Sequence, residues 1–278
     1  MSRTLQPCQL IEQSILKTFR SELWSPFVKA IRRYRLIRPG DRIAVCISGG
    51  KDSMLMAKML QLYARYGDIS FEPVFLVMDP GYSPANRRKI ESNIETLQLP
   101  ALIFESDVFE ASNSQERHPC YLCARMRRGC LYNKARELGC NKLALGHHFN
   151  DVVETTVMAM FWGAQLQAMR PILRSSSNPD MEVIRPLYMV HEDNIIDWST
   201  RNGLSFIQCA CRFTEDNAQS ENGIGASRRK EIKEMLRQMR KDNPDIEKNI
   251  FASIHNLDLD TFPGWRAGGV QYYSYEDE

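Results

Sequence analysis

The stretch RIAVCISGGKDS, residues 42–53, decides the fold. Its first part, Arg42 to Ser48, is short, apolar and rich in β-branched residues, which predicts a buried strand. A glycine pair follows, and we expect a helix from Lys51 to about Tyr66. A buried strand that turns directly into a helix is typical of an α/β protein.

The same alternation of strand and helix continues to about residue 162. In chain order, strand first, we expect the elements Glu72–Met78, Pro84–Leu97, Ala101–Glu105, Leu122–Leu138, Lys142–Gly146 and Asp151–Trp162. Apolar residues at helical spacing between Glu12 and Leu36 predict a helical segment before the sheet. The predicted fold class is therefore α/β, with a parallel sheet, helical crossovers and an N-terminal helix.

The regularity weakens after Trp162, and polar residues from Thr214 to Ser227 predict a loop. The remaining expected elements are a ribbon at 172–174 and 182–185, a helix around 191–202, a strand at 204–208 and closing helices at 227–241 and 245–257. We divide the chain into an N-terminal helical segment (1–40), a sheet domain (41–210), a C-terminal helical part of the same domain (211–257) and a tail without an assigned role (258–278).

Composition and charge exclude several classes of protein. No stretch approaches the ~20 apolar residues of a membrane span, and the N-terminus lacks the apolar core of a secretory signal, so we expect a cytoplasmic protein without a membrane partner. Its eight cysteines would stay reduced there, so clustered cysteines point to metal binding or catalysis. The net charge of +2 decides little about nucleic acid, although basic residues crowd the segments 32–38, 125–128 and 228–230.

The sequence SGGKDS forms the first candidate site, at the end of the first strand, where open α/β sheets bind ligands. Its residues are Ser48, Gly49, Gly50, Lys51, Asp52 and Ser53. Glycines let the backbone approach a phosphate, while the N–H groups of the helix start attract an anion. Neither GxxxxGK[ST] nor GxGxxG is present. The loop looks like the PP-loop, which in its family holds the pyrophosphate part of ATP; an ordinary glycine-rich turn is the alternative.

Three residues of this region have expected roles. Lys51 would stabilise the pyrophosphate that departs when the α-phosphorus is attacked. Asp52 has two interpretations. It is either a ligand to Mg²⁺ or a residue that caps the helix start and whose negative charge interacts favourably with the helix dipole. Met78, at the end of the second strand, would border the adenine of ATP, an assignment that rests on the resemblance to the PP-loop family.

The sequence GHHFND, residues 146–151, forms a second candidate site after another buried strand. We expect it on the same edge of the sheet as the first loop, so that both sites share one crevice. Gly146, His147 and Asp151 would contact the nucleotide, since imidazoles and carboxylates can hydrogen-bond phosphates or ribose. Structural roles are the alternative, above all helix capping by Asp151.

The cysteines suggest a metal site. Cys120 and Cys123 are spaced so that the start of a helix can present both to one metal. Further along the chain, the closely spaced cysteines are Cys209 and Cys211, whose Cα atoms would lie ~6.6 Å apart in a strand, so three ligands are easier to build than four. Three ligands on an iron–sulfur cubane leave one iron open for a small sulfur species. A structural zinc site, a redox CxxC pair and coincidence are the alternatives.

In combination, these motifs resemble the tRNA 2-thiocytidine synthetase family, within the PP-loop tRNA thiolases. The resemblance rests on SGGKDS, PCYLCARMRRG, LALGHHFND, RPL at Arg185–Leu187 and the late cysteine pair, in consistent order from about Ile43 to Asn256. It implies a Rossmann-like PP-loop domain of the adenine nucleotide alpha hydrolase type, with ATP and an iron–sulfur cluster bound in the part 41–210.

The resemblance also implies the chemistry. ATP adenylates a cytidine of the anticodon loop of tRNA, and sulfur then replaces its C2 oxygen. Mg²⁺, a [4Fe-4S] cluster, a homodimer and a sulfur donor, either cysteine desulfurase-derived or free sulfide, belong to that picture. The catalytic residues it suggests are Lys51, Asp52 and Asp151, and the cluster ligands are Cys120, Cys123 and Cys209.

Two departures from the family pattern keep alternatives open. The late pair is CxC where the family has CxxC, so Cys211 remains an alternative ligand, and the segment Phe213–Ala226 is longer than in the family. Rival interpretations are a PP-loop enzyme that adenylates another tRNA base, as in 2-thiouridine formation, or a small molecule. A non-catalytic metal or redox binding protein is the rival outside the enzymes.

Overall fold

The computed structural model describes residues 5–106, 119–174, 180–207 and 224–275, and for 119–125 and 224–227 it describes the backbone alone. The chain divides into two compact units, the first with Met1–Val152 and Met169–Gly223, the second with Val153–Ala168 and Ile224–Glu278. The domain boundaries expected from the sequence are not decided by this division and stay a prediction.

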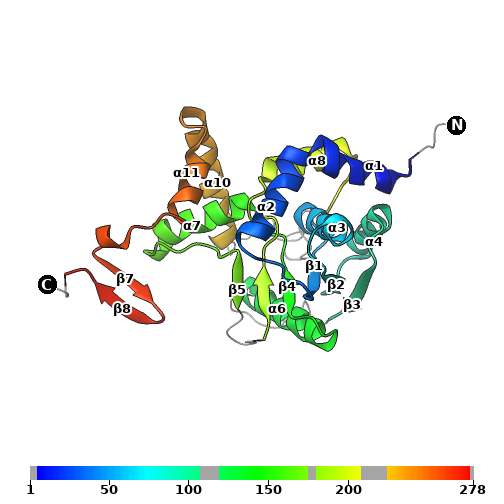
Figure 1. Cartoon of the computed structure of the whole chain (residues 1–278), viewed down its shortest axis with the longest axis horizontal. Coiled ribbons are helices and arrows are strands. Elements are labelled where there is room, and N and C mark those ends of the chain that lie inside the picture. Colours follow the sequence, from blue (N-terminus) through cyan, green and yellow to red (C-terminus); the bar gives the residue numbers. More distant parts are fainter. Residues whose placement is uncertain (1–4, 107–118, 175–179, 208–223, 276–278) are drawn as a thin grey trace. The chain divides into compact units, whose positions relative to one another are not determined.

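A mixed six-stranded sheet forms the centre of the first unit (Figure 1), in the order β3-β2-β1-β4-β6-β5. The strands are β1 (Arg42–Ile47), β2 (Glu72–Asp79), β3 (Ala101–Glu105), β4 (Lys142–Ala144), β5 (Ile172–Arg174) and β6 (Glu182–Ile184). All neighbours pair in parallel except β5, which runs antiparallel to β6. The predicted α/β fold is confirmed.

The order of the strands sets the position of the site. From β1 the chain proceeds outward through β2 to β3, then returns to place β4 on the other side of β1. The direction of winding therefore reverses between β1 and β4, and ligands of open α/β sheets bind where this reversal leaves a crevice. Both candidate loops of the sequence follow these two strands.

Helices cover both faces of the sheet. Figure 1 shows α6 on the face opposite α3 and α4. The helices of the first unit are α1 (Pro7–Gln13), α2 (Ser25–Arg33), α3 (Lys51–Tyr66), α4 (Pro84–Leu97), α6 (Pro119–Glu137) and α8 (Glu192–Arg201); α7 (Phe149–Gly163) begins in this unit and ends in the second. Tyr132 and Ala135 of α6 pack in a core with Ala44, Leu76 and Leu143 of the sheet.

The N-terminal segment is less regular than the predicted single helix. Two π-helical stretches, η1 (Ser14–Thr18) and η2 (Arg20–Trp24), separate α1 from α2. Pro26 in the first turn of α2 has no N–H to continue an α-helical ladder, which accounts for the wider turns just before it. Lys58 of α3 joins this segment to the sheet domain: its buried Nζ lies 2.6 Å from a Glu12 carboxylate oxygen and 3.0 Å from the Leu97 carbonyl oxygen.

The strands predicted after Trp162 are present in part. The ribbon at 172–174 and 182–184 is present, and β6 also joins the main sheet by pairing with β4, which the sequence did not indicate. The strand predicted from Leu204 is wrong for 204–207, because this segment pairs with none of the strands in the described part of the chain. Instead, the carbonyl of Ser205 accepts a hydrogen bond from the Asn93 side chain at 3.1 Å, while Ile207 packs against Gly49.

The second unit contains the end of α7, α10 (Ile224–Asp242), α11 (Ile246–Ser253), the short helix η3 (Leu259–Thr261) and a hairpin of β7 (Gly264–Ala267) and β8 (Val270–Tyr273). Arg229 of α10 pairs with Glu154 of α7 at 3.3 Å. Within the described ranges of both units, no helix is long and apolar enough to cross a membrane.

Candidate functional site

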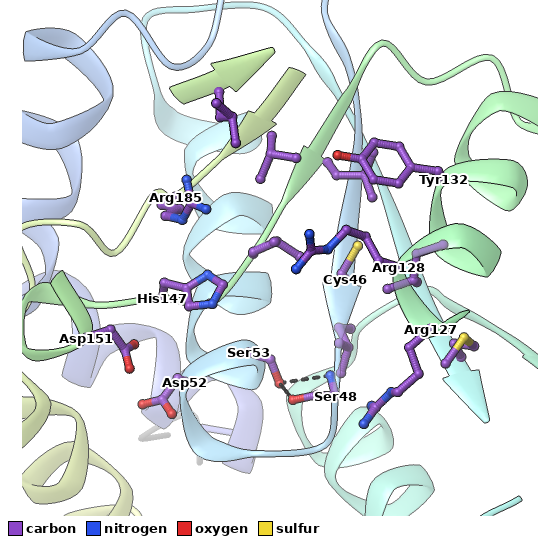
Figure 2. A pocket seen from close by; sticks show the side chains of 18 of the residues that line it. Cys46, Ser48, Asp52, Ser53, Arg127, Arg128, Tyr132, His147, Asp151 and Arg185 are labelled. Atoms are coloured by element: carbon purple, nitrogen blue, oxygen red, sulfur yellow. Dashed lines mark hydrogen bonds between the residues drawn. The ribbon is translucent and has the colours of Figure 1, made fainter. Parts of the chain in front are cut away.

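The loop between β1 and α3 is held by the hydroxyl of Ser53. This group donates to the Gly50 carbonyl at 2.9 Å and accepts from the Ser48 amide at 3.1 Å. The Ser48 hydroxyl donates to it as well, at 3.1 Å (Figure 2). Ser53 is thus an internal brace, and the loop has one defined shape before any ligand arrives.

The two glycines of the loop have different tasks. Gly49 adopts a φ of +87°, which side-chain-bearing residues rarely adopt, and a Cβ there would lie 2.7 Å from both Ile90 and Ile207 side-chain atoms. Gly50 precedes the first helical residue and no side chain caps the helix start. The N–H groups at the start of α3 are therefore available to an anionic ligand, as expected for a phosphate loop.

The second loop lies directly against the first. A Cβ on Gly146 would stand 3.0 Å from the Ser53 amide nitrogen and 3.2 Å from the carbonyl carbon of Asp52. A side chain at this position would force the start of α3 to shift by a few tenths of an ångström, so glycine suits this close approach. The expected crevice shared by both candidate loops is thereby confirmed.

A cavity of about 610 Å³ opens at this place, a volume in the range of small-molecule sites. Seven residues expected to bind the nucleotide line it: Ser48, Asp52, Ser53, Met78, Gly146, His147 and Asp151. Other lining residues include Cys46, Arg127, Arg128, Tyr132 and Arg185. Figure 2 shows Asp52, Asp151 and His147 beside the two helix starts, with Arg185 above His147 and Arg127 on the side of Ser48. Gly49, Gly50 and Lys51 belong to the loop but do not line the cavity.

Lys51 is held by two carboxylates. Its Nζ lies 2.9 Å from Glu192 and 3.2 Å from Asp52. Burial disfavours the charged ammonium, but the carboxylates of Asp52 and Glu192 outweigh burial, so the pKa of Lys51 is raised above its ordinary value. Lys51 is therefore a permanent positive charge at the loop. Glu192, the first residue of α8, has no motif around it, and sequence reasoning missed it.

The two histidines have different surroundings. His147 lines the cavity, whereas the side chain of His148 is buried, with Nε2 3.5 Å from Asp151 and 3.9 Å from Asp52. Asp151 accepts from the His148 amide at 3.0 Å. Asp151, the third residue of α7, thus caps the helix start by accepting from the amide that precedes it, as the capping interpretation expected. It also lines the cavity, and its contact with a nucleotide stays a prediction.

At the end of β2, Met78 and Asp79 also have distinct tasks. Asp79 accepts from the amides of Gly81 and Tyr82 at 2.9 and 2.8 Å and pairs with Arg87 at 2.5 Å. Burial alone would raise the pKa of Asp79, yet these donors lower it. Asp79 shapes the turn, which leaves Met78 as the residue of this strand end that faces the cavity.

The residues at the loop fit ATP with Mg²⁺. Asp52 Oδ1 is buried without a hydrogen-bond partner, although the Lys51 ammonium is near. Mg²⁺ is commonly held by one or two carboxylates together with phosphate oxygens, so this oxygen suits it. In the part of the chain that the structure describes, no three His, Cys, Asp or Glu side chains form a metal site by themselves.

The predicted cluster ligands are placed only in part. Cys120 and Cys123 lie in the first turns of α6, for which the backbone alone is described, and Cys209 and Cys211 lie outside the described residues. Among the other cysteines, Cys46 lines the cavity, but burial first, and the neighbouring Cys140 second, raise its pKa to about 12. Cys46 is therefore a protonated core thiol.

The loop at the switch point and the cavity beside it define a PP-loop protein, and the family described as PP-loop domain matches residues 17–221. A tRNA-cytidine(32) 2-sulfurtransferase from Citrifermentans bemidjiense is 36% identical over 233 residues, which cover 82% of this chain and 88% of the relative. Another from Alcanivorax borkumensis is 37% identical and covers 82% of this chain and 78% of the relative. The chain belongs to the tRNA-cytidine(32) 2-sulfurtransferase family.

A solved structure agrees on the fold. The U34-tRNA thiolase NcsA from Methanococcus maripaludis, determined with its [4Fe-4S] cluster, matches with a TM-score of 0.65 over 87% of this chain and 80% of that chain. The sequence identity is 21%, so this match shows a shared architecture.

Proposed function

We propose that this chain is an ATP-dependent tRNA sulfurtransferase that converts a cytidine of the anticodon loop to 2-thiocytidine. The observation that carries the proposal is the identity of 36% to a tRNA-cytidine(32) 2-sulfurtransferase over 82% of this chain and 88% of the relative. The phosphate loop and its cavity at the switch point supply the site that such an enzyme needs.

ATP binds with its pyrophosphate part along Ser48–Ser53 and its adenine beside Met78. The target base enters from the side of β4 and β6, and its C2 oxygen attacks the α-phosphorus. Pyrophosphate leaves, and the adenylated oxygen later departs as AMP when sulfur forms its bond to C2. Lys51 stabilises the pyrophosphate charge because its raised pKa keeps it protonated. Asp52 contributes its buried oxygen to Mg²⁺, and Asp151 orients the ligand from the cap of α7.

A [4Fe-4S] cluster on Cys120, Cys123 and Cys209, with Cys211 as the alternative third ligand, would supply an iron with an open position for a small sulfur species. The position of the first two cysteines at the start of α6 supports this, because α6 also carries Arg127 and Arg128 into the cavity. Cys46 takes no part as a sulfur carrier, since its raised pKa withholds the thiolate.

The tRNA partner also requires a surface for its backbone. A groove of about 560 Å³ is lined by four basic residues, three aromatic residues and one acid. These are Arg20, Lys29, Arg32 and Arg33, with Trp24, Tyr63 and Tyr66, and Asp68, which pairs with Arg32 at 2.9 Å. Arg32 and Arg33 belong to the first basic segment of the sequence. Such a groove suits phosphates, so tRNA binding depends on salt.

The enzyme works in the cytoplasm as a homodimer and takes sulfur from a cysteine desulfurase-derived donor or from free sulfide.

Mass spectrometry of tRNA nucleosides tests the function. Cells that lack the gene should lose 2-thiocytidine, and the gene with Lys51→Met should fail to restore it. Loss of a different thiolated nucleoside would assign the enzyme to another base. No loss of any thiolated nucleoside, together with no AMP release by anaerobically purified protein and tRNA, would refute the thiolase assignment.

A further inference from the structure

Arg185, the first residue of the RPL motif, is a buried cation of the cavity to which the proposed reaction gives no role. It follows β6, and 9% of its surface is exposed. Its amide donates to the Pro171 carbonyl at 3.0 Å, and its Nη1 donates to the Arg170 carbonyl. The side chain is therefore fixed at the cavity wall, above His147 in Figure 2.

One donor of this guanidinium is left over. The Nε atom of Arg185 is buried and has no hydrogen-bond partner. Burying an N–H of a charged group without an acceptor is costly, so native structures rarely leave one unless a ligand or water meets it. The Nε atom itself has almost no surface open to solvent, but its side chain lines the cavity, which places this unused donor beside the space that an acceptor would enter.

The charges around Arg185 define the acceptor as an anion. Arg127 and Arg128 line the same cavity, and no carboxylate among the described residues forms an ion pair with any of the three arginines. Asp151 lies near enough to favour the charged form of Arg185, but burial and the charge of Arg128 prevail and lower its pKa. The guanidinium groups of Arg185 and Arg128 repel each other across the cavity, so an oxyanion between them is favoured.

The position in the sheet indicates which substrate brings the anion. Arg185 follows β6, two strands beyond β1, whereas Met78 is the second-last residue of β2, on the other side of β1. If the adenosine lies at Met78, the Arg185 side receives the second substrate. We propose that Arg185 and Arg128 form a subsite for a phosphodiester group of the RNA, next to the base that is thiolated. This inference rests on the proposed function.

The chemistry of the group fits this task. A guanidinium offers parallel N–H groups to two phosphate oxygens, which fixes orientation as well as position. A base that leaves its stack must have its backbone held in a defined place, since proteins recognise unstacked bases together with their phosphates. Arg185 then acts as a binding residue for tRNA, and the phosphate loop keeps the triphosphate of ATP.

The test uses the full-length protein and full-length tRNA assembled by ligation, with a single methylphosphonate at one of the positions that flank the target cytidine. Arg185→Gln should weaken binding of unmodified tRNA about 10- to 100-fold, as expected for loss of one charge-assisted contact. At one of the two positions, the methylphosphonate should weaken tRNA binding to the wild-type protein by a similar factor. The same modified tRNA should bind the Arg185→Gln protein as well as unmodified tRNA does. Affinity for ATP with a methylene group between the α and β phosphates should change less than about two-fold.

Further variants keep the result decisive. Arg185→Lys should give an intermediate loss, since a point charge remains without the guanidinium fork. Arg128 is exposed and makes no hydrogen bond with the described residues, so Arg128→Gln should fold normally and weaken tRNA binding about two- to five-fold. It serves in the same methylphosphonate cycle if Arg185→Gln fails to fold.

Three outcomes separate the possibilities. Equal effects of each methylphosphonate on wild type and both variants would overturn the subsite. A loss of ATP-analogue affinity that matches the loss of tRNA affinity would assign the anion to ATP and overturn the RNA assignment. Wild-type protein that shows the cycle yet never forms 2-thiocytidine would refute the proposed function and leave the RNA phosphate subsite standing.

Discussion

Gly49→Ala should destabilise the protein far more than an alanine at another glycine with a positive φ. The residue has a φ of +87°, and an added Cβ would lie 2.7 Å from Ile90 Cγ1 and 2.7 Å from Ile207 Cδ1. Ile90 is fully buried on α4, so it has no free space into which to move. Two costs therefore combine, one in the backbone and one in packing.

The magnitudes follow from these two costs. A left-handed backbone costs a residue with a side chain roughly 1–2 kcal/mol, and inserting a carbon into a filled site costs roughly 1–3 kcal/mol. We expect Gly49→Ala to lower the free energy of unfolding by about 2–5 kcal/mol. That is a large share of the roughly 5–15 kcal/mol of a typical domain.

Gly40 provides a matched control. Its φ is +83°, and no atom lies within 4 Å of the position of an added Cβ. Gly40→Ala therefore carries the backbone cost alone, roughly 1–2 kcal/mol. The stiffening of the unfolded chain by alanine is equal at both sites and cancels in the comparison.

Urea unfolding, followed by tryptophan fluorescence, measures both variants, and calorimetry gives their affinity for the non-hydrolysable ATP analogue. Gly49→Ala should also weaken the analogue about ten-fold or more, because the loop must shift to admit the Cβ. Gly40→Ala should bind it as the wild type does. Equal destabilisation by the two alanines, or wild-type ATP affinity in Gly49→Ala, would refute the packing argument.

Other parts of the molecule give four more predictions. Glu192→Gln removes one of the two carboxylates that raise the pKa of Lys51, while the burial that lowers this pKa remains. Lys51 should therefore lose its proton at a lower pH, and the alkaline limb of the pH profile of ATP-analogue binding should move to lower pH. Cys46→Ala should keep 2-thiocytidine formation within about two-fold, by nucleoside mass spectrometry, because a thiol with a pKa near 12 is not a nucleophile at neutral pH. Lys58→Met removes the closest cation of the half-buried Glu12 carboxylate and should lower the free energy of unfolding in urea by about 3–5 kcal/mol. Arg33→Gln, in the basic groove, should weaken tRNA binding by the same factor for all sequences and reduce the slope of log K against log salt by roughly 0.7–0.9.

Each of these has a result that contradicts it. An unchanged alkaline limb in Glu192→Gln would mean that this carboxylate does not control Lys51. Loss of thiolation in a well-folded Cys46→Ala protein would make that thiol a participant. A Lys58→Met protein as stable as the wild type would show that the buried pair is replaceable by apolar packing, and an unchanged salt slope in Arg33→Gln would place the tRNA backbone elsewhere.

The candidate site was predictable wherever it depends on local sequence. A buried strand that ends in two glycines can continue as a helix in few ways, and the exposed N–H groups of that helix suit a phosphate whatever the rest of the chain does. The same reasoning located Gly146 and Asp151, since the carboxyl ends of parallel strands share one edge. The strand expected at 204–207 failed because a short apolar run is equally suited to packing over a loop, where Ile207 contacts Gly49.

By itself, the sequence determined the α/β class, the phosphate loop, its neighbour at 146–151 and the spacing of the cysteines, because each depends on bonds between residues close along the chain. Only the tertiary structure decided which side chains meet at the loop. Lys51 and Glu192 are 141 positions apart, and their contact exists because α8 starts beside the switch point. Arg185 reached the cavity in the same way, when β6 paired with β4, and pairing between distant strands follows from packing and hydrogen bonding across the whole sheet.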